Sequence, residues 1–152
     1  MAYVCRELDA SATDAFDVLI DPTTYPSWLV GAESIRDVDP TWPAEGARFH
    51  HRVGVGPLSI PDYSEVLAFE PGVRLRLRVR ARPFVAAVVE LHVIGGERRC
   101  VVTMEEEPER RIIGNLVRPL LDPTIHVRNQ RSLRRLAGVV DARRRARTGV
   151  RP

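Results

Sequence analysis

Three segments in the middle of the chain alternate between apolar and polar residues. In residues 73–80 every odd position is apolar and every even position is arginine, and residues 85–93 keep apolar side chains at the odd positions. Gly95 and Gly96 separate this segment from a third alternating stretch, residues 98–107. A period of two is typical of a β-strand with one buried and one solvated face, so we predict three consecutive antiparallel strands.

Weaker alternation in the first half of the chain predicts four further strands. These cover residues 2–9, 33–39, 48–55 and 58–70. Pro61 interrupts the last of them, and because proline has no backbone N–H to donate, we expect a bulge or a sheet edge at that point.

Helix-start signals lie between the first two predicted strands. Ser11, with Asp14 three residues later, resembles a capping box. Asp21 followed by Pro22 indicates the start of a second helix, because Asp caps a helix and Pro suits its first position. We therefore expect two short helices, the second ending near Trp28.

Residues 109–144 carry apolar residues at helical spacing, which predicts one long amphipathic helix. Pro119 and Pro123 each remove a backbone donor, so we expect a kink or a break within residues 118–123. The apolar stripe comprises Ile112, Ile113, Leu116, Val117, Leu120 and Leu121 in the first half, and Leu133, Leu136, Ala137 and Val140 in the second.

This order of elements favours an α+β fold. A long helix cannot bury an apolar stripe by itself, so we expect a curved, seven-stranded antiparallel sheet to wrap around it and leave an apolar pocket between them. Residues 1–142 are predicted to form this single domain. Residues 143–152 are rich in arginine and lack an apolar pattern, which predicts a disordered tail.

Composition excludes several classes of protein. The chain has 152 residues, enough for one domain with a substantial core. No apolar run reaches the roughly 18–20 residues that span a bilayer, and no signal peptide is visible, so we expect a cytoplasmic protein without a transmembrane segment. The basic residues are all arginine, which suggests a GC-rich bacterial genome. The net charge of +3 is too small to predict nucleic-acid binding.

No metal site, cofactor motif or nucleophile motif is recognisable. The four histidines are not spaced as zinc ligands, and Cys5 and Cys100 match no metal or redox motif. The two cysteines fall on strands predicted to be neighbours, so a contact between them is conceivable, but buried free thiols are expected in a reducing compartment. We expect no metal, no cofactor and no covalent catalysis.

Three groups of positions along the chain form a family signature. Glu65, Phe69 and Pro71 precede an apolar strand, and Ser132 and Leu136 lie near the end of the last helix. The opening group comprises Val4, Leu8, Ala10, Phe16, Leu19, Asp21, Pro22, Tyr25, Pro26 and Trp28. Together these positions resemble the START/Bet v 1-like (SRPBCC) superfamily, and more narrowly its polyketide cyclase/dehydrase and lipid-transport group.

The resemblance implies a helix-grip fold that encloses an apolar cavity. Members bind lipids, sterols, quinones or polyketides, and a minority perform chemistry on them. In cyclases of this group, polar residues on the middle strands orient a poly-β-keto chain. Tyr63 and Ser64 could serve here, but no arginine follows them within the strand, which weakens the cyclase interpretation.

Candidate cavity residues follow from the predicted faces. His51 shares a face with apolar neighbours and is either packed in the core or catalytic. His126 and Asn129 fall on the apolar side of the last helix. In a packed core their polar groups would be costly without partners, whereas in a cavity they would hydrogen-bond a ligand or water, and both alternatives stay open. The full predicted set is Trp28, Phe49, His51, Tyr63, Leu75, Leu77, Val89, Leu91, Val102, Met104, His126 and Asn129.

The arginine row of the alternating strands has two interpretations. It is either a solvated sheet face paired with Glu90 and Glu105, or a docking surface for an anionic partner. Its members are Arg74, Arg76, Arg78, Arg80 and Arg82.

Three functions therefore stay open. The first is binding or transport of a hydrophobic small molecule, the second a cyclase or dehydratase that uses His51, Tyr63 or His126, and the third a protein-interaction module acting through the arginines. The protein is expected to be a monomer or a homodimer.

Overall fold

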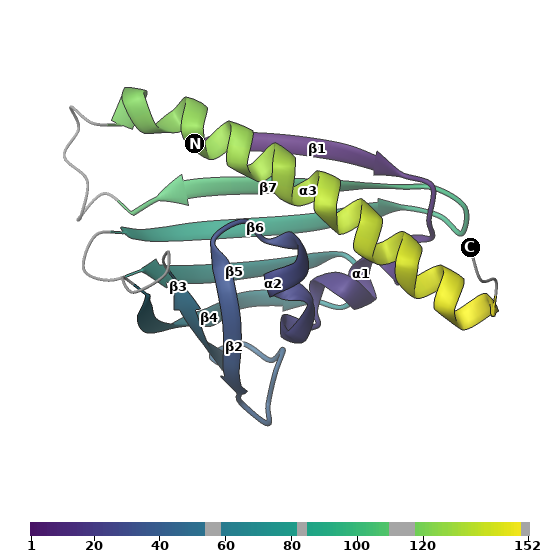
Figure 1. Cartoon of the computed structure of the whole chain (residues 1–152), viewed down its shortest axis with the longest axis horizontal. Helices are drawn as coiled ribbons and strands as arrows, with labels where there is room; N and C mark the ends of the chain where they lie inside the picture. The colour runs from purple at the N-terminus through teal and green to yellow at the C-terminus, as the bar shows by residue number, and fades with distance from the viewer. Residues whose placement is uncertain (54–58, 82–84, 110–117, 150–152) are drawn as a thin grey trace.

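The computed structural model describes residues 1–53, 59–81, 85–109 and 118–149. Seven strands and a long C-terminal helix dominate this part of the chain, with short helical segments after the first strand (Figure 1). In chain order the elements are β1 (Ala2–Leu8), α1 (Ala12–Leu19), the 3-10 helix η1 (Pro22–Thr24), α2 (Tyr25–Trp28), β2 (Ala32–Val38), β3 (Arg48–Val53), β4 (Ile60–Glu70), β5 (Arg74–Ala81), β6 (Val85–Gly95), β7 (Cys100–Pro108) and α3 (Arg118–Thr148).

The strands form one antiparallel sheet in the order β1-β7-β6-β5-β4-β3-β2. Helix α3 crosses one face of this curved sheet diagonally, and α1 and α2 lie on the same side (Figure 1). The predicted fold class, a seven-stranded sheet around a C-terminal helix with two short helices after the first strand, is confirmed.

The strand register explains the alternating sequence. Leu75 lies opposite Leu91 and Leu77 opposite Val89, and all four are buried on the inner face that meets the helices. Arg76 pairs with Glu90 on the outer face. Burial of one face therefore sets the register, because a slip by one residue would turn the arginines inward.

Strand β4 contains an irregularity, but not at the proline. Pro61 pairs in register with Arg52 of β3. The register shift lies between Val66 and Ala68, on the side of β4 that faces β5. The bulge is therefore several residues further along the strand than the position of Pro61 suggested.

The capping signals in the N-terminal region act as predicted. The Ser11 side chain accepts a hydrogen bond from the backbone N–H of Asp14 at 3.0 Å and caps α1. Asp21 caps η1 by accepting from the backbone N–H of Thr23 at 3.1 Å, and Pro22 takes the first position.

Helix α3 runs unbroken from Arg118 through Pro123 to Thr148, so of the predicted kink or break the break is wrong. Pro123 lies near the start of the helix and removes only one backbone hydrogen bond. The helix continues because the turns after Pro123 keep their own hydrogen bonds. The first part of the predicted stripe, with Ile112, Ile113, Leu116 and Val117, lies outside the described residues. In the second part the buried stripe comprises Asn129, Ser132, Leu133, Leu136 and Val140.

The predicted tail is also corrected for residues 143–148, which form the last turns of α3. Three arginines there bind carboxylates of the N-terminal helical region: Arg143 pairs with Asp21, and Arg147 pairs with Asp14 at 2.8 Å. Arg144 reaches Asp14 at 3.7 Å. The arginine-rich sequence without apolar residues predicted disorder because the ion pairs that hold these residues join distant parts of the chain and cannot be seen in the sequence.

The outer-face arginines are largely paired. Arg74 and Arg76 both contact Glu90, at 3.1 and 3.2 Å. Arg78 contacts Glu109 at 2.7 Å. Arg82 lies outside the described residues. These pairs favour the solvated-face interpretation, with Glu109 alongside Glu90 as a counter-ion.

The two cysteines are free thiols. Cys5 is exposed and pairs in register with Thr103, whereas Cys100 is buried opposite Leu8. Within the described ranges, no group of three or more His, Cys, Asp or Glu side chains is arranged to hold a metal ion. The helices of that same part of the chain include none that is long and apolar enough to cross a membrane.

The packing of α3 on the sheet predicts a large effect of truncating its stripe. Leu136 is fully buried, so Leu136→Ala should lower the free energy of unfolding by about 2–5 kcal/mol. Val127 on the same helix is 58% exposed, and Val127→Ala should change it by less than about 0.5 kcal/mol. Urea denaturation followed by circular dichroism measures both values. Equal values for the two variants would contradict the placement of α3.

Candidate functional site

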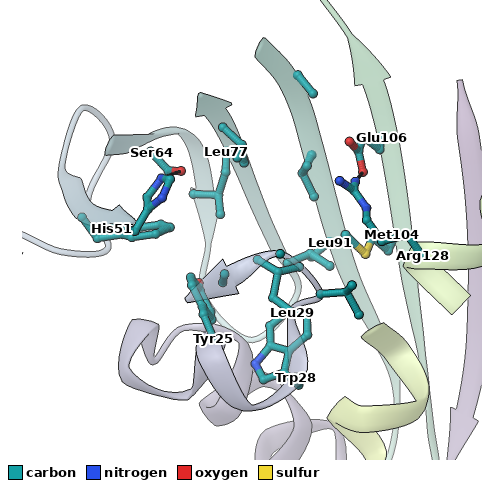
Figure 2. Close-up of a pocket in the computed structure, with 17 residues that line it drawn as sticks. Tyr25, Trp28, Leu29, His51, Ser64, Leu77, Leu91, Met104, Glu106 and Arg128 are labelled. Atoms are coloured by element: carbon teal, nitrogen blue, oxygen red, sulfur yellow. Dashed lines mark hydrogen bonds and ion pairs between the residues drawn. The ribbon is translucent and has the colours of Figure 1, made fainter. Parts of the chain in front are cut away.

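A cavity of about 120 Å³ lies between the inner face of the sheet, α2 with the loop after it, and α3 (Figure 2). This volume is in the range of an engineered cavity of about 150 Å³ that holds a benzene ring. The cavity is lined by Tyr25, Trp28, Leu29, Val30, Gly31, Ala32, Phe49, His51, Ser64, Leu77, Val79, Ala87, Val89, Leu91, Met104, Glu106 and Arg128.

The sheet contributes an apolar wall. Leu77 and Val79 come from β5, Val89 and Leu91 from β6, and Met104 from β7. These residues are the inward-facing positions of the alternating strands. The wall therefore follows from the same periodicity that keeps the arginines on the outside.

The α2 side contributes two aromatic residues with fixed orientations. The Tyr25 hydroxyl donates to the carbonyl of Leu19 at 2.7 Å, and the Trp28 indole N–H donates to the hydroxyl of Thr24 at 3.0 Å. Burial, followed by the nearby charge of Asp21, raises the pKa of Tyr25 far above its usual value, so the phenol is neutral. Tyr25 and Trp28 are rigid walls, because their polar atoms already have partners.

A polar pair closes one end of the cavity. His51 of β3 and Ser64 of β4 are 3% and 0% exposed, and the His51 Nε2 and Ser64 Oγ atoms are 3.0 Å apart. Adjacent strands bring them together, since Ser64 lies opposite Phe49 and His51 lies opposite Asp62. We call His51 and Ser64 the inner polar pair.

The environment of His51 favours the neutral imidazole. Burial is the largest influence and lowers its pKa, and the positive charges of Arg36 and His50 lower it further. The charge of Asp62 and a hydrogen bond with the backbone of Tyr63 act in the opposite direction without cancelling the effect. His51 can therefore accept a proton, or share one with Ser64, at neutral pH.

A second polar group lies at the other end, on β7 and α3. Arg128 donates to Glu106, and the side-chain amide of Asn129 donates to the same Glu106 oxygen at 3.0 Å. Glu106 is 4% exposed and Asn129 is fully buried, whereas the Arg128 side chain is 38% exposed. Arg128 therefore marks the end where the cavity meets solvent. We call Arg128, Glu106 and Asn129 the outer polar cluster.

The structure places seven of the twelve predicted cavity residues in the lining: Trp28, Phe49, His51, Leu77, Val89, Leu91 and Met104. Leu75 and Val102 are fully buried in the core instead. Asn129 does not line the cavity but supports it by holding Glu106.

Two predicted cavity residues point elsewhere. Tyr63 lies on the outer face, where its ring is 4.6 Å from the Arg48 guanidinium and 5.1 Å from that of Arg80. It alternates with the inward-facing Ser64, so both neighbours could not have faced the cavity. His126 is exposed and bonds Gln130 at 3.0 Å. Its helical phase matches the buried stripe, but among residues 123–149, whose burial the structure describes, the stripe begins at Asn129.

Four lining residues with polar groups, Tyr25, Ser64, Glu106 and Arg128, were not in the predicted set. Ser64 was considered beside Tyr63 but left out of the set, although it shares the parity of Val66, which is buried on β4. Glu106 has the parity of Met104, but the run of glutamates around it suggests a solvated strand end. Arg128 belongs to the arginine-rich side of α3, and only its contact with Glu106 distinguishes it.

The state of His51 predicts a pH dependence. Its pKa in the folded protein lies below the unfolded value of about 6.5, so between these two values the unfolded chain binds more protons. Stability contributed by neutral His51 should be complete above about pH 6.5, fall as the pH drops below that value, and level off below the folded pKa. Histidine NMR titrations and urea denaturation measure this, with His51→Gln assigning the resonance. An unchanged pH dependence in His51→Gln would contradict the prediction.

Comparison with solved structures shows where else this architecture occurs. The Zhui aromatase/cyclase from Streptomyces sp. R1128 superposes with a TM-score of 0.71 at 17% identity, covering 98% of each chain. TTHA0849 from Thermus thermophilus gives 0.65 at 18% identity, covering 93% of this chain and 97% of that one. The di-domain ARO/CYC BexL of the BE-7585A biosynthetic pathway gives 0.65 at 12% identity, covering 99% of this chain and 50% of that one. At these identities the likeness establishes the fold.

Comparison of sequences gives the family. No curated protein matches the chain. Residues 3–141, nearly the whole chain, match the family described as polyketide cyclase / dehydrase and lipid transport. With the helix-grip fold and an apolar cavity between sheet and helix, the protein belongs to the polyketide cyclase / dehydrase and lipid transport family.

Proposed function

We propose that the protein binds a hydrophobic small molecule in the cavity between the sheet and α3. The observation that carries this proposal is the lining: most of its members are apolar, and the polar ones are gathered at two ends. Ligand sites in proteins have this composition, a mostly apolar surface with a few placed polar groups. Family membership and the fold it shares with aromatase/cyclases support the same function.

The cavity also weighs against an interaction module acting only through the arginines. Such a module would not require an open interior, and a void in a core costs contacts that packing would otherwise supply. The outer arginines Arg74, Arg76 and Arg78 meanwhile have carboxylate partners.

Acid–base chemistry on the bound molecule is a second candidate function. The inner polar pair supports it, because a neutral imidazole in contact with a hydroxyl can take up a proton from a substrate and return it. Binding in the apolar cavity would hold a carbonyl compound against His51 and Ser64, and positioning of this kind accelerates proton transfer. A cyclase or dehydratase reaction requires such proton transfers next to a carbonyl.

Filling the cavity should weaken the binding of an apolar molecule. Ala87 lines the cavity, whereas its neighbour Val88 points to the outer face. Ala87→Leu should weaken the affinity for benzene, an apolar probe of the size that the cavity volume suits, by about tenfold or more, because the larger side chain occupies the space of the ligand. Val88→Leu should leave the affinity unchanged. Isothermal titration calorimetry measures both; equal affinities of the two variants would place the ligand elsewhere.

A simple exchange reaction tests the second candidate. If the inner polar pair transfers protons, the wild-type protein should accelerate deuterium exchange at the methyl group of acetophenone in heavy water by about a hundredfold over buffer. His51→Gln and Ser64→Ala should each lose this acceleration while still binding benzene. Proton NMR follows the exchange. If acetophenone binds but its exchange is not accelerated, the acid–base function is contradicted and the binding function stands.

A further inference from the structure

We propose that the ligand is a neutral molecule with an apolar ring body and an oxygen at each end, one on the inner polar pair and a carbonyl on Arg128. This inference rests on the proposed function and adds the chemistry of the ligand and its orientation in the cavity. Figure 2 shows the two polar groups on opposite sides of the cavity, with Leu77 and Leu91 between them.

The sheet topology explains why these groups are apart. His51 and Ser64 come from β3 and β4, Glu106 comes from β7, and β5 and β6 lie between them in the sheet. The inward-facing residues of the two intervening strands are apolar. A bound molecule that fills the space between the ends therefore meets apolar walls along its body and hydrogen-bonding groups only at its ends.

The inner polar pair recognises an oxygen in either tautomer. When Ser64 donates to Nε2 of His51, the hydroxyl oxygen keeps lone pairs that accept from a ligand hydroxyl. When His51 donates instead, the Ser64 proton is left for a ligand carbonyl. The pair is uncharged at neutral pH and buried, so it favours a neutral oxygen over an ionised group that would lose its hydration.

Arg128 lines the cavity and keeps one guanidinium nitrogen that no described residue uses. Its Nη2 donates to Glu106, and its Nε and Nη2 reach the Asn129 side-chain oxygen at 3.3 Å. Its Nη1 makes no hydrogen bond to the residues that the structure describes, and the side chain lines the cavity. A ligand oxygen can therefore accept from Nη1 while Glu106 stays bound.

Glu106 decides the charge of that ligand oxygen. Its carboxylate neutralises Arg128 and is 4% exposed, so a ligand carboxylate at Nη1 would meet a buried negative charge, and within the described part of the chain Arg128 is the only cation paired with that charge. Like charges in a poorly solvated site repel strongly. A neutral carbonyl accepts the same hydrogen bond without that repulsion, which makes Glu106 a specificity-determining residue.

A ligand series separates the two ends. The probes are naphthalene, naphthol, acetylnaphthalene, naphthoic acid and a hydroxy-ketone, which is a naphthol with an acetyl group at the opposite end. Each compound is also tested as its analogue with a single benzene ring, because one ring suits the cavity volume. Isothermal titration calorimetry at pH 7.5 should show that each neutral oxygen adds about threefold to tenfold in affinity, with the hydroxy-ketone the tightest. Naphthoic acid, ionised at this pH, should bind no better than naphthalene.

Two variants with matched controls assign the ends. Ser64→Ala should remove only the gain from the hydroxyl, whereas Ser27→Ala, an exposed serine of α2, should change nothing. Glu106→Gln should reverse the charge preference, so that the acid gains about tenfold and binds tighter than the ketone. Glu105→Gln, its outward-facing neighbour on β7, should keep the preference of the wild type. If Glu106→Gln does not fold, the doubly neutral variant Arg128→Gln with Glu106→Gln should lose the gain from the ketone.

The outcomes distinguish this inference from the function on which it rests. If naphthalene binds as tightly as the hydroxy-ketone, or the acid binds the wild type as tightly as the ketone, the inference is overturned and the apolar-ligand function stands. An unchanged preference in Glu106→Gln also overturns it. If none of the probes binds, both the inference and the proposed function fail.

Discussion

The contact between α3 and the inner face of the sheet is the interaction on which the rest of the structure depends. Leu133, Leu136 and Val140 are fully buried there and anchor the C-terminal half of the helix. Towards the N-terminal half the stripe turns polar at Asn129, with the half-exposed Arg128 beside it, and the cavity begins where the close packing ends. A helix that packed tightly along its whole length would leave no room for a ligand, so the same element provides both the core and the cavity.

The polar groups of the cavity are compatible with a stable fold because each has a protein partner. His51 and Ser64 bond one another, and Glu106 is held by Arg128 and Asn129. Unpartnered groups at these burial levels would cost free energy of folding. These groups bond each other in the absence of a ligand and still have donors or acceptors left for one. The unliganded site therefore does not destabilise the protein, which suits both a carrier and an enzyme that positions its substrate.

The candidate site was harder to predict than the fold, for two physical reasons. A strand pattern states which residues share a face but only the pairing states which face is inside, so Tyr63 and Ser64 were both candidates although one had to point outward. A helix pattern shows which residues lie on the same face of the helix, but not how far along the helix that face is covered by the sheet. His126 was therefore placed in the cavity although it is exposed. Glu106 and Arg128 were missed because in the sequence each is typical of a solvated charge, and only the tertiary structure shows that they contact each other.

The sequence by itself determined the elements, the apolar wall and the family resemblance, because hydrophobic periodicity, caps and turn residues act locally and leave their trace in short stretches of chain. It therefore predicted the helix-grip fold, and it placed residues such as Leu77, Leu91 and Met104 in the lining. Only the tertiary structure decided how the ends of the cavity are built and how far α3 extends. Those features depend on contacts between β3 and β4, between β7 and α3, and between Arg147 and Asp14 across the chain, and such contacts have no local period.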